Sequence, residues 1–335
     1  MLTAFVDGSN IYGSDSHTAE ALRTKTDGLL RTHELGPTLP TRQDAELESE
    51  ENQNPMDLVA GDIRALENPG LTSIHSMFVA EHNRIARILK SKNADLEDEE
   101  LYEISRSVVS AELQNIVYSE FLPVVLGEQE MVMFNLRLPE YDNTVYDPTV
   151  VADVTNEFAT AAFRFGHSLI PNSILVAQEP VRTKTISCPI KDTFFTFEEF
   201  NIGSDLSGKA WQNMVRGIAT QDSPRFDSSM NHAVLDYLFC GENCALPGGF
   251  GQDLAARNIQ RGRDHGLQPY TKYRENCNLT ALTDWESRPD EISEEDWKNL
   301  EIVYSNVADI DLFVGGLAEI SNDDGLVGPT FGCSI

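Results

Sequence analysis

The chain has 335 residues, enough for one large domain with a substantial core, and its 41% apolar and 24% charged residues are typical of a globular protein. Its formal net charge of −29 argues against nucleic acid and anionic membranes as partners, because phosphate binding needs an excess of Lys and Arg. No apolar run reaches the about 18 residues of a membrane span, and residues 1–10 lack the basic and apolar regions of a signal peptide.

Helical periodicity follows an irregular, loop-rich segment over 1–60, in which the acidic stretch 41–55 predicts an exposed loop. Apolar residues recur at helical spacing over 71–90. A second long helix is expected over 97–122, where the acidic residues 97–100 favour the first turn.

A third helix is expected over 149–166, after Pro148, with Val151, Val154, Phe158, Ala162 and Phe165 buried, and it should stop before Pro171. Strand alternation is weak. Shorter helices are predicted over 197–217, 225–239 and 251–264, and the best strand candidate is 183–188. These patterns predict a mainly α fold in a single compact domain over 1–335, with long ordered loops and little β structure.

The histidines are the first candidates for chemistry. His75 and His82 lie seven residues apart on one helix, about 10.5 Å of rise, which is too far to share a metal ion, so both are interpreted as structural or surface residues. His265 reads as a histidine at an ion-paired helix end. His167 follows an apolar helix and Gly166, which leaves room for a flat group beside the imidazole. Residue type alone leaves two interpretations open for His167, a core residue or a ligand.

Six stretches decide between them, because together and in this order they resemble the animal-type haem peroxidases, and most closely their peroxidasin, peroxinectin and chorion-peroxidase branch. The resemblance covers nearly the whole chain. The stretches are LTAFVDGSNIYGS (2–14), AGDIRALENPGLTSIHSMFVAEHNRIA (60–86), VYSEFLPVVLG (117–127), AAFRFGHSLI (161–170), GQDLAARNIQRGRDHGL (251–267) and VGPTFGC (327–333).

The resemblance implies that the cofactor is haem b and that His167 is the proximal ligand of its iron. Asn258 would hold the other ring nitrogen, as a ligating histidine requires. Arg64 matches the distal arginine, a catalytic residue that stabilises the negative charge developing when the O–O bond of peroxide breaks. Glu67 matches a carboxylate that forms an ester with a haem methyl group, and three residues from Arg64 it can face the same pocket. On this interpretation, His167 and Arg64 lie on opposite sides of one flat cavity.

Further residues match other family features. Arg164 and Arg261 match arginines near the haem propionates. Four alternating residues match a calcium loop whose oxygens suit Ca²⁺, and they are Thr3, Phe5, Asp7 and Ser9.

The five cysteines form no CxxC pair, which argues against a zinc ribbon or a thioredoxin-type centre. By resemblance Cys277 and Cys333 form a disulfide, whereas Cys240 and Cys244 either form a local bridge or are free, and Cys188 is left over. A disulfide and the sequon at Asn278 fit an oxidising, extracellular location, although residues 1–10 show no signal peptide.

We therefore expect a haem peroxidase that reduces hydrogen peroxide, oxidises halide or phenolic donors and responds to oxidative stress. Two alternatives remain open, namely a catalytically silent haem-binding or adhesion module and a fatty-acid dioxygenase of the same superfamily. In the family the distal histidine lies upstream of the calcium loop, and another segment follows the VGPTFGC stretch. We accordingly expect this chain to be a fragment, incomplete at both ends, of a longer peroxidase.

Overall fold

The computed structural model describes residues 2–33, 38–47, 57–138, 148–177, 185–195, 210–241, 244 and 247–335. Their contacts divide the chain into two compact units. Unit 1 comprises residues 1–114, 172–222 and 239–249, and unit 2 comprises residues 115–171, 223–238 and 250–335. The expected single domain over 1–335 stays a prediction.

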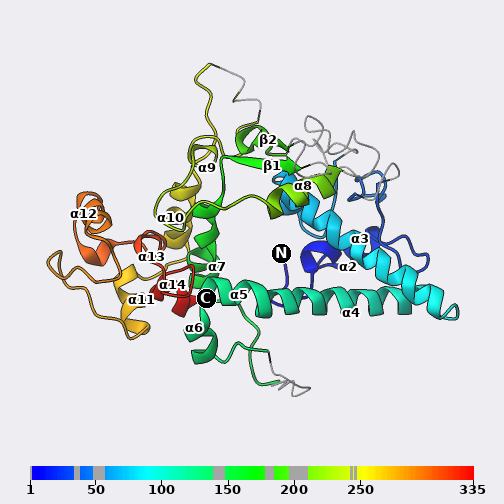
Figure 1. Ribbon diagram of the computed structural model, residues 1–335, viewed down its shortest axis with the longest axis horizontal. Coiled ribbons are helices and arrows are strands. Elements are labelled where there is room, and N and C mark those ends of the chain that lie inside the picture. The colour runs from blue at the N-terminus through cyan, green and yellow to red at the C-terminus, as the bar shows by residue number, and fades with distance from the viewer. Residues whose placement is uncertain are drawn as a thin grey trace. The chain divides into compact units, whose positions relative to one another are not determined.

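Unit 1 is built on two long helices, α3 (Pro69–Lys92) and α4 (Asp98–Ile116), of which α4 passes into unit 2 after Gln114 (Figure 1). A two-stranded antiparallel sheet pairs β1 (Ser173–Ala177) with β2 (Thr185–Pro189), and α8 (Ala210–Ala219) packs on both β1 and α3. The shorter elements are α1 (Ser9–Tyr12), α2 (Ser16–Ala21), η1 (Ile63–Leu66) and η4 (Ile190–Asp192).

The buried face of α3 is largely polar. It includes His75, His82 and Asn83, each of which is hydrogen-bonded within unit 1. The Nε2 of His82 donates to Gly28 O (2.9 Å), and its Nδ1 accepts from the hydroxyl of Tyr12 (3.0 Å). His75 and His82 are therefore buried structural residues. The structural interpretation of these histidines is confirmed, and the surface interpretation is excluded.

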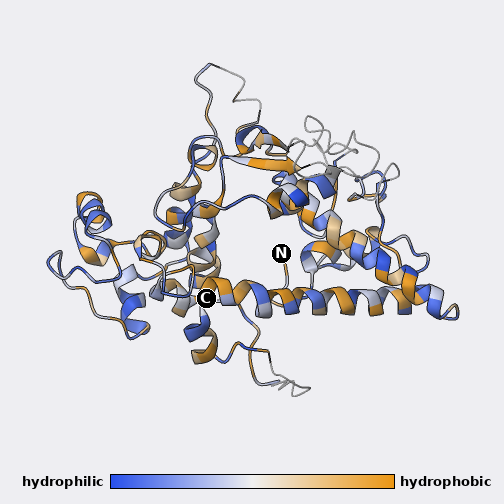
Figure 2. Cartoon of the chain, in the orientation of Figure 1, coloured by the Kyte–Doolittle hydropathy of each residue, from blue (hydrophilic) through white to orange (hydrophobic). Residues whose placement is uncertain are grey.

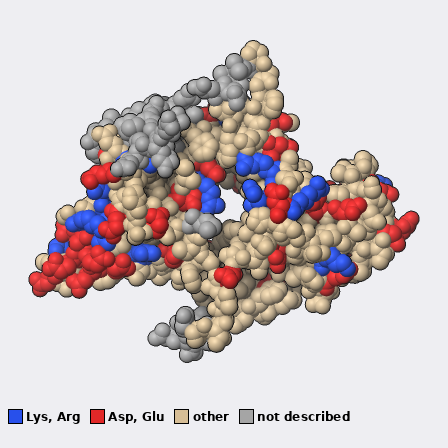
Figure 3. All heavy atoms as spheres, turned by 180° about the vertical axis from the view of Figure 1, so that it is seen from behind, with Lys and Arg blue, Asp and Glu red and all other residues tan. Residues whose placement is uncertain are grey.

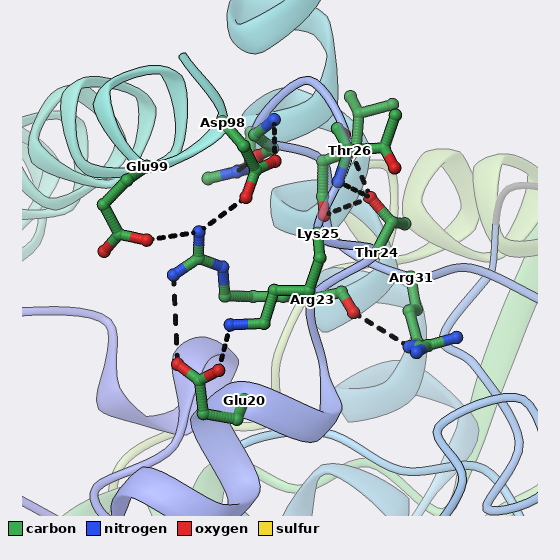
Figure 4. A network of polar contacts seen from close by, with 11 residues as sticks. Glu20, Arg23, Thr24, Lys25, Thr26, Arg31, Asp98 and Glu99 are labelled. Carbon is green, nitrogen blue, oxygen red and sulfur yellow. Dashed lines mark hydrogen bonds and ion pairs between the residues drawn. The ribbon is translucent and has the colours of Figure 1, made fainter.

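A buried arginine links α2 to the start of α4 (Figure 4). Arg23 donates to Asp98 (2.9 Å) and pairs with Glu99 (2.7 Å), while its guanidinium lies 3.9 Å from the centre of the Tyr102 ring. Asp98 also accepts from the N–H of Gly28 (2.7 Å), the residue whose carbonyl binds His82. These contacts compensate the desolvation of the arginine and tie the N-terminal segment to the long helices.

Unit 2 is a set of short helices around an apolar core that includes Phe165, Tyr270 and Phe331. The elements around His167 are α7 (Asn156–Thr160), the 3₁₀ helix η3 (Ala162–Leu169) and α10 (Leu254–Asp264). The remaining elements are the π-helical η2 (Val117–Phe121), α5 (Leu122–Leu126), α6 (Glu128–Met133), α9 (His232–Leu235), α11 (Tyr270–Asn276), α12 (Glu294–Val303), η6 (Val307–Asp309), α13 (Leu312–Ala318) and α14 (Pro329–Ser334).

The mainly α prediction is confirmed, and so are the helices expected over 71–90 and 97–122. The second of these continues through η2 and α5 to Leu126. Figure 2 shows apolar and polar residues alternating along α4, whose buried residues are Leu101, Tyr102, Ser105 and Val109. The strand predicted over 183–188 corresponds to β2, although residues 183 and 184 lie outside the described part of the chain. Its partner β1 was not predicted.

The prediction of a helix over 149–166 is wrong for its first half. Helix α7 begins only at Asn156, because the side chain of Thr155 caps it by accepting the N–H of Phe158 (3.3 Å). Val151 and Val154 are consequently exposed rather than buried, with 74% and 48% of their surface accessible, and Phe158 is only partly buried. Ala162 and Phe165 are buried as predicted, but on η3.

Two of the shorter helices also differ from expectation. The helix predicted over 225–239 is reduced to α9, because Asn231 caps a helix that starts there by accepting the N–H of Ala233 (2.8 Å). Only α8 represents the helix predicted over 197–217, whose residues 197–209 lie outside the described part. The helix predicted over 251–264 is confirmed as α10, which Asp253 caps by accepting the N–H of Ala256 (2.9 Å).

The cysteines form two bridges, Cys277–Cys333 and Cys240–Cys244. The first was implied by the family resemblance. The second shows that Cys240 and Cys244 form a local bridge rather than being free. Cys188 is free and buried, as the left-over cysteine.

Acidic side chains gather at the N-terminal end of α4 on the face shown in Figure 3, where Glu97, Glu99, Glu100 and Glu103 are exposed. Of the helices that the structure describes, none is both long and apolar enough to cross a bilayer.

Candidate haem site

His167 is held by an asparagine that is distant in sequence. His167 lies on η3, and its Nδ1 is 2.7 Å from the Nδ2 of Asn258 on α10. Asn258 has no accessible surface, so water cannot replace it at the imidazole. The structure thus brings together the two residues that the resemblance assigned to the proximal side.

Arg164 completes this group as a third member. Its Nη1 donates to Asn258 Oδ1 (2.9 Å), and its Nε donates to Ala159 O (3.0 Å). The buried amide of Asn258 is therefore bound at both ends, by Arg164 and by His167.

The other side of His167 is open. No described residue hydrogen-bonds its Nε2, and a Cβ built on the neighbouring Gly166 would meet no atom within 4 Å. Burial, followed by the positive charge of Arg164, lowers the pKa of His167 to about 4. The imidazole is therefore neutral at physiological pH, which is the form that binds a metal ion. A free nitrogen, a neutral ring and open space beside Gly166 fit a flat metal-containing cofactor.

Arg257 and Arg261 add positive charge close to Arg164. Burial, and then the charges of Arg261 and Arg257, lower the pKa of Arg164. Arg261 is exposed and forms no ion pair with any described residue. Guanidinium groups that lie this close together favour an anion, and the propionates of a haem would supply two.

A separate cavity of about 200 Å³ reaches Asn258 from the side of Ile310, Asp311 and Phe313. His167 does not line this cavity.

In unit 1, Arg64 and Glu67 lie on a single tight turn. Asp62 caps η1 by accepting the N–H of Arg64 (2.8 Å), and its carboxylate binds the Arg64 guanidinium through Nε (2.8 Å) and Nη2 (3.0 Å). These bonds raise the pKa of Arg64, with a smaller contribution from Glu67, and the same pair lowers the pKa of Asp62. The side chain of Arg64 is 61% exposed. The structure thus brings Arg64 and Glu67 near each other.

The predicted calcium loop folds back on itself. The Oγ1 of Thr3 lies 3.2 Å from the Oγ of Ser9 and 3.5 Å from the carbonyl oxygen of Phe5, and Asp7 Oδ1 accepts the N–H of Ser9 (2.9 Å). The hydroxyl of Ser110 on α4 anchors the loop at Asp7 O (3.0 Å). Only one of the four predicted ligands carries a carboxylate. In the described residues, no group of three or more His, Cys, Asp or Glu side chains could hold a metal ion.

The predicted residues fall into the two units, with Arg64, Glu67 and the calcium loop in unit 1 and the proximal group in unit 2. That His167 and Arg64 lie on opposite sides of one cavity stays a prediction. His265 caps the C-terminal end of α10, where Arg263 pairs with Asp311 (2.7 Å), so it is a histidine at an ion-paired helix end, as predicted. Its Nδ1 lies 3.2 Å from Asn156 Oδ1.

Sequence reasoning missed two partners. Asp62, which binds Arg64, stands two residues before it, and this spacing is a detectable capping signal. The contact of Arg164 with Asn258 spans 94 residues, so only tertiary structure could reveal it.

A mainly helical fold with a histidine whose Nε2 has no described partner, beside a cluster of arginines, fits the class of haem-binding proteins. The chain belongs to the animal haem peroxidases, because the family profile described as "Animal haem peroxidase" matches residues 1–335. Membership of this family implies haem as the cofactor.

Similar proteins agree with this assignment. The chain is 37% identical to peroxidasin homolog pxn-1 of Caenorhabditis elegans, covering 100% of this chain and 26% of that protein. It is 33% identical to peroxinectin A of Dictyostelium discoideum, covering 98% and 58% respectively. The solved structure of peroxidase A from the same organism matches with a TM-score of 0.82 at 30% identity, covering 98% of this chain and 60% of that one. The chain thus spans about a quarter to three fifths of the length of these proteins.

The fold is shared more widely. A fatty acid alpha-dioxygenase from Arabidopsis thaliana matches with a TM-score of 0.74 at 22% identity, covering 98% of this chain and 53% of that one. At this identity the match shows the fold alone.

Proposed function

We propose that this chain forms the core of a haem peroxidase that reduces hydrogen peroxide and oxidises small donors such as halides or phenols. A bound haem would supply the iron at which peroxide takes up two electrons and the donor gives them up. The observation that carries the proposal is the 2.7 Å contact of His167 with buried Asn258, beside the open space at Gly166.

The chain's own residues would each have a defined task. His167 would bind the iron through Nε2, and Asn258 would fix the orientation of the ring. Arg164 and Arg261 would pair with the two propionates. Arg64 would leave Asp62 and donate to the departing oxygen of peroxide, where negative charge develops.

The test is to add haem to the purified chain and record its Soret absorption. We expect His167→Ala to weaken haem binding at least about 100-fold, because it removes the residue that would bind the iron. The matched control is His232→Ala, which removes an exposed histidine of the same unit whose only described ionic partner is Asp236. Equal haem binding by His167→Ala and the unchanged chain would contradict the proposal.

Turnover then separates the reactions. Oxidation of a phenol that depends on peroxide supports the peroxidase, and its loss in Arg64→Met with haem still bound would assign the catalytic role to Arg64. Haem binding without turnover would indicate a silent module. Oxygen uptake with an unsaturated fatty acid would indicate a dioxygenase.

The proposal also includes a calcium site and a covalent ester bond to the haem. Thr3, Phe5, Asp7 and Ser9 would bind Ca²⁺, supported by the convergence of three of their oxygens. We expect Ca²⁺ to raise the melting temperature of the unchanged chain and not that of Asp7→Ala. Glu67 would form the ester to haem, and after acid denaturation mass spectrometry should find haem attached to the peptide that contains it.

An extracellular location also belongs to the proposal. Two disulfides and the exposed sequon at Asn278 support it. The expected modification is a glycan on Asn278, detected as a mass difference that disappears in Asn278→Gln.

A further inference from the structure

Two helices of unit 2 are joined by a disulfide and also by a buried carboxylate beside it. Cys277 at the end of α11 is bonded to Cys333 on α14. Three residues before each cysteine stands a polar residue with no accessible surface, Arg274 on α11 and Thr330 on α14. Residues three apart lie on the same side of a helix, so Arg274 and Thr330 lie about one turn from the bridge.

Glu319, which directly follows α13, binds both of these residues. Its Oε1 accepts from Arg274 Nη1 (3.1 Å) and from the hydroxyl of Thr330 (2.6 Å), and its Oε2 accepts the N–H of Thr330 (2.8 Å). The hydroxyl of Tyr270 on α11 donates to the same Oε1 (2.7 Å). The side chain of Glu319 has no accessible surface, so water cannot take its place. One carboxylate therefore links α11 to α14.

The link depends on the ionised form of Glu319. Neither an arginine nor a backbone N–H can accept a hydrogen bond, so a carboxylate, which only accepts, satisfies its partners. Burial raises the pKa of Glu319, whereas the hydrogen bonds from Thr330 and Tyr270 and the charge of Arg274 oppose this rise. An amide in its place would direct its NH₂ group at the N–H of Thr330 or at Arg274, whichever way it is turned.

Helix α14 also fits closely against Glu319 and α13 without help from the sulfur atoms. A Cβ built on Gly328, the residue before α14, would collide with the side chain of Glu319. A Cβ on Gly316 of α13 would collide with the ring of Phe331 on α14. These close approaches and the carboxylate hold α14 in place by contacts that remain when the disulfide is reduced.

We propose that Glu319 is a positioning residue for the Cys277–Cys333 bridge. In the reduced chain it keeps α11 and α14 together, so that the two thiols stay within reach of each other and readily re-form their bond. A bridge prepared in this way resists reduction, because the reduced form gains little freedom when the bond opens. This role does not depend on the proposed haem chemistry.

The experiment is equilibration of the chain with mixtures of reduced and oxidised dithiothreitol, followed by alkylation of free thiols and mass spectrometry of the peptides. Dithiothreitol gives two electrons and two protons to the Cys277–Cys333 bond, which opens to two thiols, and closes to its own ring disulfide. The ratio of the two dithiothreitol forms at half-reduction gives the reduction potential of the bridge. The Cys240–Cys244 bridge in unit 1 is the internal reference in every sample.

Glu319→Gln should make the Cys277–Cys333 bridge easier to reduce and leave the reference bridge unchanged. We expect the equilibrium constant for forming the bridge to fall about 10-fold, which raises its potential by about 30 mV. Circular dichroism confirms that the variant is folded under the same conditions. An unchanged potential would overturn the proposal.

The matched control is Glu291→Gln. It removes the other carboxylate that pairs with Arg274 (3.1 Å), but Glu291 forms no described hydrogen bond with α14. Because Glu291 is partly exposed, we expect the equilibrium constant to stay within about 2-fold of that of the unchanged chain. A fall as large as that in Glu319→Gln would show that any loss around Arg274 has this effect, and the proposal would be wrong.

Thr330 provides a second test should Glu319→Gln fail to fold. Thr330→Val removes the hydroxyl that donates to Glu319 and should lower the equilibrium constant about 3-fold. Thr330→Ser loses a methyl group but keeps the hydroxyl, so it should stay closer to the unchanged chain. If Thr330→Ser falls as far as Thr330→Val, packing and not the bond to Glu319 positions the bridge, and the proposal is overturned.

Discussion

His82 is fully buried in unit 1 and His167 is partly buried in unit 2, and the two differ in the use of one ring nitrogen. His82 in unit 1 uses both ring nitrogens, with Gly28 O and the Tyr12 hydroxyl as partners, whereas His167 in unit 2 uses only Nδ1. Burial is the main cause that lowers the pKa of each to about 4. Burial and a depressed pKa therefore do not distinguish a structural histidine from a ligand. What distinguishes His167 is its Nε2, which has no described hydrogen-bond partner and lies next to the open space at Gly166.

The largest expected effect comes from removing each imidazole in turn. His82→Ala leaves a cavity and two buried partners without hydrogen bonds, so it should reduce the free energy of unfolding by about 3–4 kcal/mol. His167→Ala leaves only Asn258 without one partner and should cost about 1–2 kcal/mol. Urea denaturation of the cofactor-free chain measures both, and an equal loss would break the comparison.

Acid should destabilise the chain in part through His82. Its pKa is about 4 in the folded chain, against 6.5 for a freely exposed histidine, so the unfolded chain binds the proton more tightly. The stability from the neutral ring is thus complete above about pH 6.5 and falls by about 3 kcal/mol toward pH 4. Urea midpoints across this range check it. His82→Gln should show a shallower pH dependence, and an unchanged slope would assign the effect to other groups.

Gly166→Ala sharpens the comparison from the side of His167. Its added methyl group meets nothing within 4 Å, and the residue has no positive φ, so the cofactor-free chain should change in stability by less than about 1 kcal/mol. If the open space receives a macrocycle, haem binding should weaken about 10-fold or more. Haem titration decides, and unchanged affinity would show that the cofactor lies elsewhere.

The smallest effect is expected at the other candidate residue, Arg64. The Arg64 side chain is 61% exposed, and an asparagine at position 62 could still accept the N–H of Arg64, so Asp62→Asn should change the free energy of unfolding by no more than about 0.5 kcal/mol. Thermal unfolding checks this, with Asp284→Asn as the control at an exposed aspartate in unit 2. A loss above about 2 kcal/mol would show that this turn is part of the folded core.

The sequence predicted much of the candidate site because its residues sit in motifs. The positions of His167 and Asn258, and the Cys277–Cys333 bridge, followed from the family resemblance and are found in contact. Helix boundaries were harder to predict, since Thr155 caps α7 where periodicity suggested a continuous helix from residue 149.

The contact of Arg164 with Asn258 could not be predicted. Nothing near Arg164 in the sequence points to Asn258, and a propionate partner was the simpler expectation. The bond between them depends on η3 and α10 packing in unit 2, which no sequence pattern encodes.

The Cys277–Cys333 bridge joins the end of α11 to α14 across 56 residues of chain. A protease that cuts once anywhere between the two cysteines would leave both pieces covalently attached. Such nicked molecules would migrate as one band on a denaturing gel and separate into two only after a thiol reductant is added. Damage of this kind would escape notice in any preparation analysed without one.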